Sequence, residues 1–137
     1  MKGIHLVGDL DQCKCTDALL RSCGVLEHLL VSECCAVGLT VVASTFHQFG
    51  TDAAPGGVTG VVLLEESHVC VHTWPELRCV TLDVYVCSVS KDNSPAARDL
   101  FRRLVELFAP ERAEASVLRR GEKGETSRAA TALQAGD

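Results

Sequence analysis

Hydrophobic residues follow two kinds of pattern along the chain, one typical of helices and the other of strands. Over two stretches, apolar residues recur every three or four positions, as one face of a helix requires. The first helix is predicted between residues 16 and 38, and the second between residues 93 and 110, where Pro110 ends it. Their inward-facing residues are Leu19, Leu20, Cys23, Leu26, Leu30, Cys34 and Val37 in the first helix, and Leu100, Phe101, Leu104 and Phe108 in the second.

Strand-sized apolar runs surround these helices. They cover residues 4–7, 39–49, 58–64, 68–74, 80–86 and 115–118. Most links between them are short, which favours an antiparallel sheet with both helices on one face, an α+β fold. We therefore expect one domain over residues 1–120. The polar, non-periodic residues 121–137 are expected to form a disordered tail.

One predicted hairpin has two faces of different character. A turn at residues 75–78 pairs Trp74 with Cys79, His72 with Thr81, Cys70 with Asp83 and His68 with Tyr85. One face is then a core face, formed by Val69, Val71, Thr73, Val80, Leu82, Val84 and Val86. The other face carries His68, Cys70, His72, Trp74, Thr81, Asp83, Tyr85 and Cys87, which is too polar for a core and too aromatic for an ordinary surface.

The same register places Cys87 opposite Glu66 and next to Ser67. Three reactive side chains, Ser67, His72 and Cys87, are therefore expected in one region of the sheet. Spacing alone favours a buried structural thiol at Cys87 over a catalytic role.

Composition and charge exclude several classes of protein. The chain has 137 residues, 47% hydrophobic and 23% charged, enough for one core, and its net charge of −5 argues against nucleic-acid binding. No apolar run approaches the roughly 18 residues of a membrane helix, and early acidic residues interrupt any signal peptide, so we expect a cytoplasmic protein without membrane contact.

The metal-binding patterns are weak. The eight cysteines include no C-x-x-C pair, and most are expected to be small buried apolar residues. His68 and His72 would lie about 13 Å apart along a strand, too far to share one ion. No metal site is therefore predicted.

Longer motifs identify a family. The run GVTGVVLLEESHVCVHTWPE at residues 57–76, followed by LDVYVC ending at Cys87, resembles the bacterial and archaeal S-adenosylmethionine decarboxylases. The upstream segments KGIHLVGDL and GLTVVASTFHQF fit the same family, so the resemblance covers roughly residues 3–120. These are small enzymes that depend on a covalent pyruvoyl group.

The resemblance implies a self-processing proenzyme. The chain would cut itself between Glu66 and Ser67 into fragments 1–66 and 67–137, and Ser67 would become the pyruvoyl group. His72 matches the base that assists this processing, and Thr59 matches a hydroxyl residue that supports it. The pyruvoyl group would form a Schiff base with the substrate and serve as electron sink in place of pyridoxal phosphate. Cys87 matches the proton donor.

The resemblance also implies a substrate, an assembly and a pathway. S-adenosylmethionine would be decarboxylated to the aminopropyl donor for spermidine and polyamine biosynthesis. Glu76 matches a substrate-contacting carboxylate, and Phe49 and Trp74 match aromatic residues near the adenine and sulfonium. The family fold is a two-layer α/β sandwich that pairs into a four-layer αββα homodimer with the active site at the interface.

Three alternatives stay open at this point. The same chemistry could act on arginine or ornithine, because Ser67, His72 and Cys87 do not select the substrate. Leu77-Arg78 also departs from the family pattern, and Arg78 would repel a cationic substrate if it pointed inward. A non-catalytic regulatory relative would be expected to have lost one of those three residues. The last alternative is a cysteine-rich metal-binding module.

Overall fold

A single antiparallel sheet forms the frame of the molecule. The structure is a computed structural model that describes residues 1–121 and 131–134. Its strands are β1 (Lys2–Cys13), β2 (Val41–Gly50), β3 (Pro55–Leu64), β4 (Ser67–Trp74), β5 (Cys79–Ser88), β6 (Pro110–Arg120) and β7 (Thr131–Gln134). They lie in the order β2-β3-β4-β5-β1-β6-β7, and every neighbouring pair is antiparallel.

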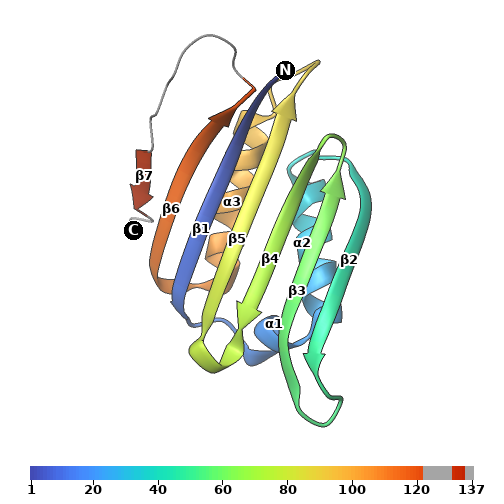
Figure 1. Ribbon diagram of the computed structural model, residues 1–137, viewed down its shortest axis with the longest axis vertical. Coiled ribbons are helices and arrows are strands. Elements are labelled where there is room, and N and C mark those ends of the chain that lie inside the picture. The colour runs from blue at the N-terminus through green and yellow to red at the C-terminus, as the bar shows by residue number, and fades with distance from the viewer. Residues whose placement is uncertain (122–130, 135–137) are drawn as a thin grey trace.

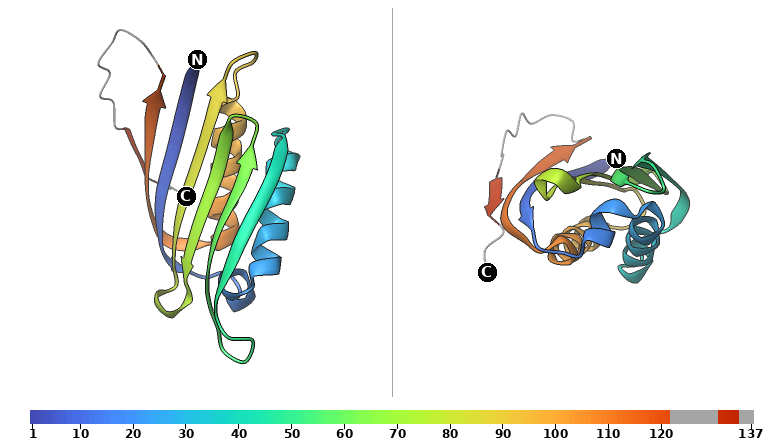
Figure 2. Two further views of the ribbon diagram at one scale, coloured as in Figure 1. Left: turned by 45° about the vertical axis from the view of Figure 1, so that its right-hand side comes forward. Right: turned by 90° about the horizontal axis from the view of Figure 1, so that it is seen from below.

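The α-helices of the described residues all lie on one face of this sheet, and none of them lies on the other. They are α1 (Asp17–Arg21), α2 (Cys23–Ala36) and α3 (Ser94–Phe108), and Figures 1 and 2 show them behind the strands in one layer. The expected α+β class and two-layer arrangement are confirmed. The sheet face without helices is called the open face below.

The first helix differs from its prediction. One continuous helix was expected, but the structure has two, so within residues 1–121 three α-helices rather than two cover the sheet. The chain turns at Ser22, which is extended (φ −99°, ψ 109°), and the Ser22 side chain accepts a hydrogen bond from the Val25 N–H. A serine that caps the second helix therefore ends the first. The apolar spacing runs across this break and hides it.

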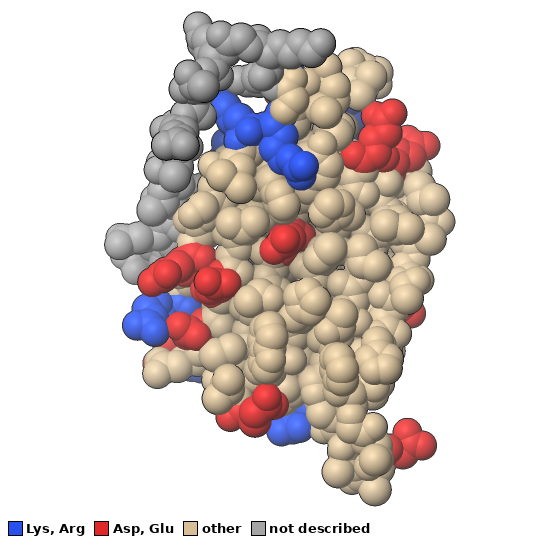
Figure 3. All heavy atoms as spheres, viewed as in Figure 1, with Lys and Arg blue, Asp and Glu red and all other residues tan. Residues whose placement is uncertain are grey.

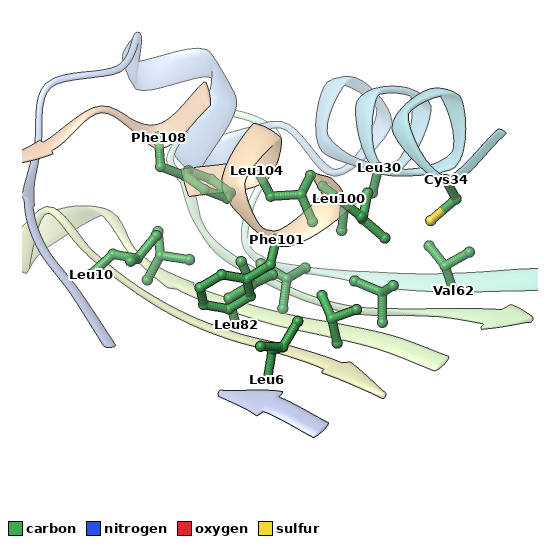
Figure 4. Packing of buried hydrophobic residues seen from close by; sticks show 14 of the residues in the cluster. Leu6, Leu10, Leu30, Cys34, Val62, Leu82, Leu100, Phe101, Leu104 and Phe108 are labelled. Atoms are coloured by element: carbon green, nitrogen blue, oxygen red, sulfur yellow. The ribbon is translucent and has the colours of Figure 1, made fainter. Parts of the chain in front are cut away.

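The core lies between the helices and the inner face of the sheet, as Figure 4 shows. Leu100, Leu104 and Phe108 of α3 are fully buried, and so is the predicted core face of the β4–β5 hairpin. Gly8 of β1 makes room for one large core ring, since a Cβ there would lie 2.7 Å from Cζ of Phe101.

The C-terminal segment is described only in part. Of the residues expected to be disordered, 121–137, the structure describes Gly121 and the short strand β7, which pairs with the outer edge of β6. The others lie outside the described residues. Within the described part of the chain, no helix is long and apolar enough to cross a membrane.

Candidate active site

The β4–β5 hairpin has the predicted register. Trp74 pairs with Cys79, His72 with Thr81, Cys70 with Asp83 and His68 with Tyr85. The polar and aromatic members of these pairs therefore lie on the open face. Figure 3 views this face and shows that charged side chains gather toward its margins, while few lie over β3, β4 and β5.

Ser67 stands immediately after a tight turn. Leu64 of β3 pairs with Ser67 of β4, so Glu65 and Glu66 alone connect the two strands. Glu66 has φ +57°, a left-handed conformation that costs a residue with a Cβ roughly 1–2 kcal/mol. The backbone is thus strained at the residue that precedes Ser67.

Cys87 is held beside Ser67. The Cys87 N–H donates to Oγ of Ser67 at 3.1 Å, and the Cys87 carbonyl accepts from Nδ2 of Asn93 at 2.9 Å. The Cys87 side chain is buried, and its Sγ lies 2.8 Å from the Tyr85 hydroxyl. That hydrogen bond, followed by burial, raises the pKa of the Tyr85 phenol. The predicted proximity of Ser67 and Cys87 is therefore present in one chain.

A pocket of about 560 Å³ opens where Ser67 and Cys87 meet. Its other lining residues come from the α2–β2 connection, the β3–β4 turn and the loop after β5: Gly38, Leu39, Thr40, Leu64, Glu65, Glu66, Val89, Ser90, Lys91 and Asn93. Ser67 and Cys87 both contribute to the lining of this pocket.

His72 lies elsewhere on the sheet. It is five residues from Ser67 along β4, which corresponds to about 16 Å. Its Nδ1 is 3.0 Å from Oγ1 of Thr59, its partner on β3. The structure therefore joins His72 to Thr59 and does not bring it to Ser67 within one chain.

The residues expected to contact substrate lie at the His72 end of the sheet. Trp74 is two residues beyond His72 and its ring centroid is 6.2 Å from that of His72. Phe49 packs edge-on against His47 at 4.7 Å, and Glu76 is exposed in the turn Pro75–Leu77 that follows β4. Trp74 is 39% exposed and Phe49 is 49% exposed, so both rings are available for contact.

Arg78 is directed into a different part of the molecule. Its Nε donates to the Cys13 carbonyl at 2.9 Å, and its guanidinium also donates to the Cys15 carbonyl. A third contact joins it to Asp17 at 3.7 Å. Its charge is thus held by the connection between β1 and α1, which answers the concern that it would repel a cation near Trp74.

All eight cysteines lie among the described residues, and all are free thiols. Burial raises the pKa of both Cys13 and Cys34 to about 12. In the described part of the chain, no three His, Cys, Asp or Glu side chains come together as metal ligands.

One cluster on the open face was not predicted. His5 of β1 packs against His68 and Tyr85, with ring centroids 6.0 and 5.6 Å away, and its Nε2 is 3.4 Å from Oδ2 of Asp83. Burial, together with the neighbouring His5, lowers the pKa of His68. The sequence did contain one signal for Tyr85. It stands two positions before Cys87 in a strand, and residues two apart in a strand lie on the same face.

The comparisons with known proteins agree with one another. The family model for S-adenosylmethionine decarboxylase matches residues 4–121. The S-adenosylmethionine decarboxylase proenzyme of Archaeoglobus fulgidus is 36% identical over 119 residues, covering 87% of this chain and 97% of the relative. That of Methanococcus maripaludis is 34% identical, covering 87% and 89%. A crystal structure of the adenosylmethionine decarboxylase from Aquifex aeolicus aligns with a TM-score of 0.76 and 29% identity, covering 93% of this chain and 97% of that one.

Proposed function

The chain belongs to the S-adenosylmethionine decarboxylase family, and we propose that it cuts itself at Glu66–Ser67 and then decarboxylates S-adenosylmethionine. The product would be the aminopropyl donor of polyamine biosynthesis. The observation that carries this proposal is the contact between Ser67 and Cys87 behind a strained turn. The free thiols suit the reducing cytoplasm, where we expect the protein to work.

The residues around Ser67 fit the formation of a pyruvoyl group. Oγ of Ser67 accepts a hydrogen bond from Cys87 N–H, so its own proton stays available to a base. The hydroxyl oxygen attacks the Glu66 carbonyl carbon, its proton is transferred to the amide nitrogen, the C–N bond breaks, and an ester and the free amine of Ser67 form. Cleavage also releases the left-handed backbone of Glu66, which favours the forward reaction.

The ester is then removed by elimination. A base takes the Ser67 Cα proton, the Cβ–Oγ bond breaks, and Glu66 leaves as a new C-terminal carboxylate. The dehydroalanine at position 67 takes up water and loses ammonia, which leaves a ketone. His72 is the proposed base, and its hydrogen bond with Thr59 fixes the orientation of its ring.

The distance between Ser67 and His72 supports a dimer. In each copy Cys87 lies at one end of the open face, with Ser67 beside it at the start of β4, and His72, Thr59, Trp74 and Phe49 lie at the other end. Two such sheets can pack face to face about a twofold axis perpendicular to their strands. The Ser67 end of one copy then lies over the His72 end of the other. The partner subunit's His72 would then reach Ser67, and two equivalent sites would form.

Exposed apolar side chains on the open face fit this arrangement. Phe49, Leu63, Trp74 and Leu118 are all large and exposed there. Pairing two open faces would remove this apolar surface from water and complete the four-layer αββα sandwich.

Once formed from Ser67, the pyruvoyl group would supply the electron sink for decarboxylation. Cys87, the proposed proton donor, lies beside Ser67 and can deliver its proton to the carbon that lost the carboxylate. From the partner's end of the sheet, Glu76 would contact the substrate, and the rings of Phe49 and Trp74 would attract the cationic sulfonium. No pyridoxal phosphate or metal is needed for this chemistry.

The substrate is tested by a direct comparison. Carbon dioxide release is measured from S-adenosylmethionine, arginine and ornithine with the purified protein, and Ser67→Ala is the control. Release from S-adenosylmethionine alone supports the proposal. Release from arginine or ornithine in its place would assign the same machinery to another amino acid, and no release from a processed protein would contradict a decarboxylase.

A further inference from the structure

Tyr85 is aligned with Cys87 by the geometry of strand β5. The two residues are separated by one position, so both side chains project from the open face. The Tyr85 hydroxyl lies 2.8 Å from Sγ of Cys87, within hydrogen-bond distance. A phenol O–H can donate to sulfur, and it does so most strongly when the sulfur is a thiolate.

Four neighbours fix the Tyr85 ring in this position. The ring lies over Gly3, where an added Cβ would approach Tyr85 Cε2 to 3.2 Å. His5 and His68 pack at its sides, with centroids 5.6 and 5.4 Å away, and Cζ of Arg120 lies 4.5 Å from its centroid. These contacts come from β1, β4 and β6, so the hydroxyl is held at the thiol by three other strands.

We propose that Tyr85 is a positioning residue for the proton donor Cys87. When the Cys87 S–H bond breaks, the proton forms a C–H bond at the carbon that lost carbon dioxide, and the electron pair stays on sulfur. The Tyr85 O–H then donates to this thiolate. The inference rests on the proposed function, because it requires Cys87 to be the proton donor.

Other charged groups surround the pair and would act on the same thiolate. They are His5 from β1, His68 from β4, Asp83 from β5, Arg120 from β6, Glu66 from the β3–β4 turn and Lys91 from the loop after β5. Tyr85 differs from these groups because its hydroxyl lies 2.8 Å from the sulfur, within hydrogen-bond distance. Removing the hydroxyl oxygen of Tyr85 should therefore separate its effect on the thiolate from the effects of the charged groups.

The main test is Tyr85→Phe, which keeps the ring and removes the hydroxyl. The matched control is Ser116→Ala, which removes a hydroxyl from the open face two residues along the sheet from Tyr85 and two strands away. Processing is followed by intact mass, and kcat is measured across pH. The pH dependence of alkylation is read on the peptide that carries Cys87.

For Tyr85→Phe we expect normal processing and a kcat lower by roughly 10- to 100-fold, the effect of losing one hydrogen bond to a charged group. The alkylation midpoint of Cys87 should rise by about one pH unit, and the alkaline limb of kcat should move with it. Ser116→Ala should change neither quantity. An unchanged midpoint with unchanged kcat would overturn the proposal.

A second measurement does not depend on processing. Tyr85 is the only tyrosine in the chain, so its ionisation is read directly from tyrosinate absorbance, and fluorotyrosine incorporation alters this residue alone. Cys87→Ala should lower the pKa of Tyr85, and a more acidic fluorotyrosine should lower the alkylation midpoint of Cys87. If both quantities stay fixed, the two groups are not coupled. If they move while the protein decarboxylates nothing, the coupling holds and the proposed function fails.

Discussion

One inactive variant of this protein, Ser67→Ala, should restore processing to another, His72→Ala. The Ser67→Ala chain has no nucleophile but keeps His72, whereas the His72→Ala chain keeps Ser67 and lacks the base. If the site forms between two copies, a mixed dimer contains one complete site. In that site, Ser67 comes from the His72→Ala chain and the base comes from its partner.

The strand geometry explains why rescue requires two chains, and random pairing gives its expected extent. Five residues of β4 separate Ser67 from His72, or about 16 Å, whereas proton transfer requires about 3 Å. A histidine in the same strand therefore cannot serve its own Ser67. With equal amounts of both chains and random pairing, about half of the His72→Ala chains enter mixed dimers, so about half should be cut.

The assay is co-expression of the two chains with different affinity tags, followed by intact mass under denaturing conditions. Capture on both tags in sequence confirms that mixed dimers exist. The control replaces the Ser67→Ala chain with the double variant Ser67→Ala/His72→Ala, which should give no rescue. Confirmed mixed dimers without cleavage would refute the shared site, and so would rapid cleavage of the His72→Ala chain by itself.

Three further outcomes test separate parts of the structure. Cys87→Ala should be processed normally but decarboxylate about 10²- to 10⁴-fold more slowly, because the proton donor is lost; full turnover, measured as carbon dioxide release, would remove its assigned role. Gly8→Ala should lower the free energy of unfolding by about 1–3 kcal/mol, since the new Cβ would meet the Phe101 ring at 2.7 Å, and a denaturant midpoint equal to that of the parent would show that the ring has room to move. The buried Cys34 thiol has its pKa raised to about 12, so above pH 9 the unfolded chain holds fewer protons than the native one and stability should fall with rising pH. Replacing Cys34 with Val should flatten this slope between pH 9 and 12, and a slope identical to that of the parent would assign it to other groups.

The fold was largely predictable because the apolar patterns are local. Alternation along β4 and β5, with Pro75 between them, determines the register of that hairpin. The break at Ser22 was not predictable, since apolar residues at helical spacing stand on both sides of it. The full lengths of β1 and β6 also escaped prediction, because these strands pair with each other across more than 90 residues of sequence and carry polar side chains on the open face.

The candidate site was predictable for neighbours in one hairpin and not beyond it. Ser67 and Cys87 meet as the register requires. His72 was expected near Ser67, although its distance along the strand could have been calculated from the sequence. The direction of Arg78 depends on carbonyl groups of Cys13 and Cys15, more than 60 residues earlier, and no local pattern encodes such a contact.

The intact mass of the purified protein under denaturing conditions shows whether the chain has cut itself. Two fragments divided between Glu66 and Ser67 are expected, with a ketone in place of the amine at the start of the second fragment. Ser67→Ala should give one chain of full mass. A single uncut chain from the unmodified protein would contradict the account, because without that cleavage no electron sink forms.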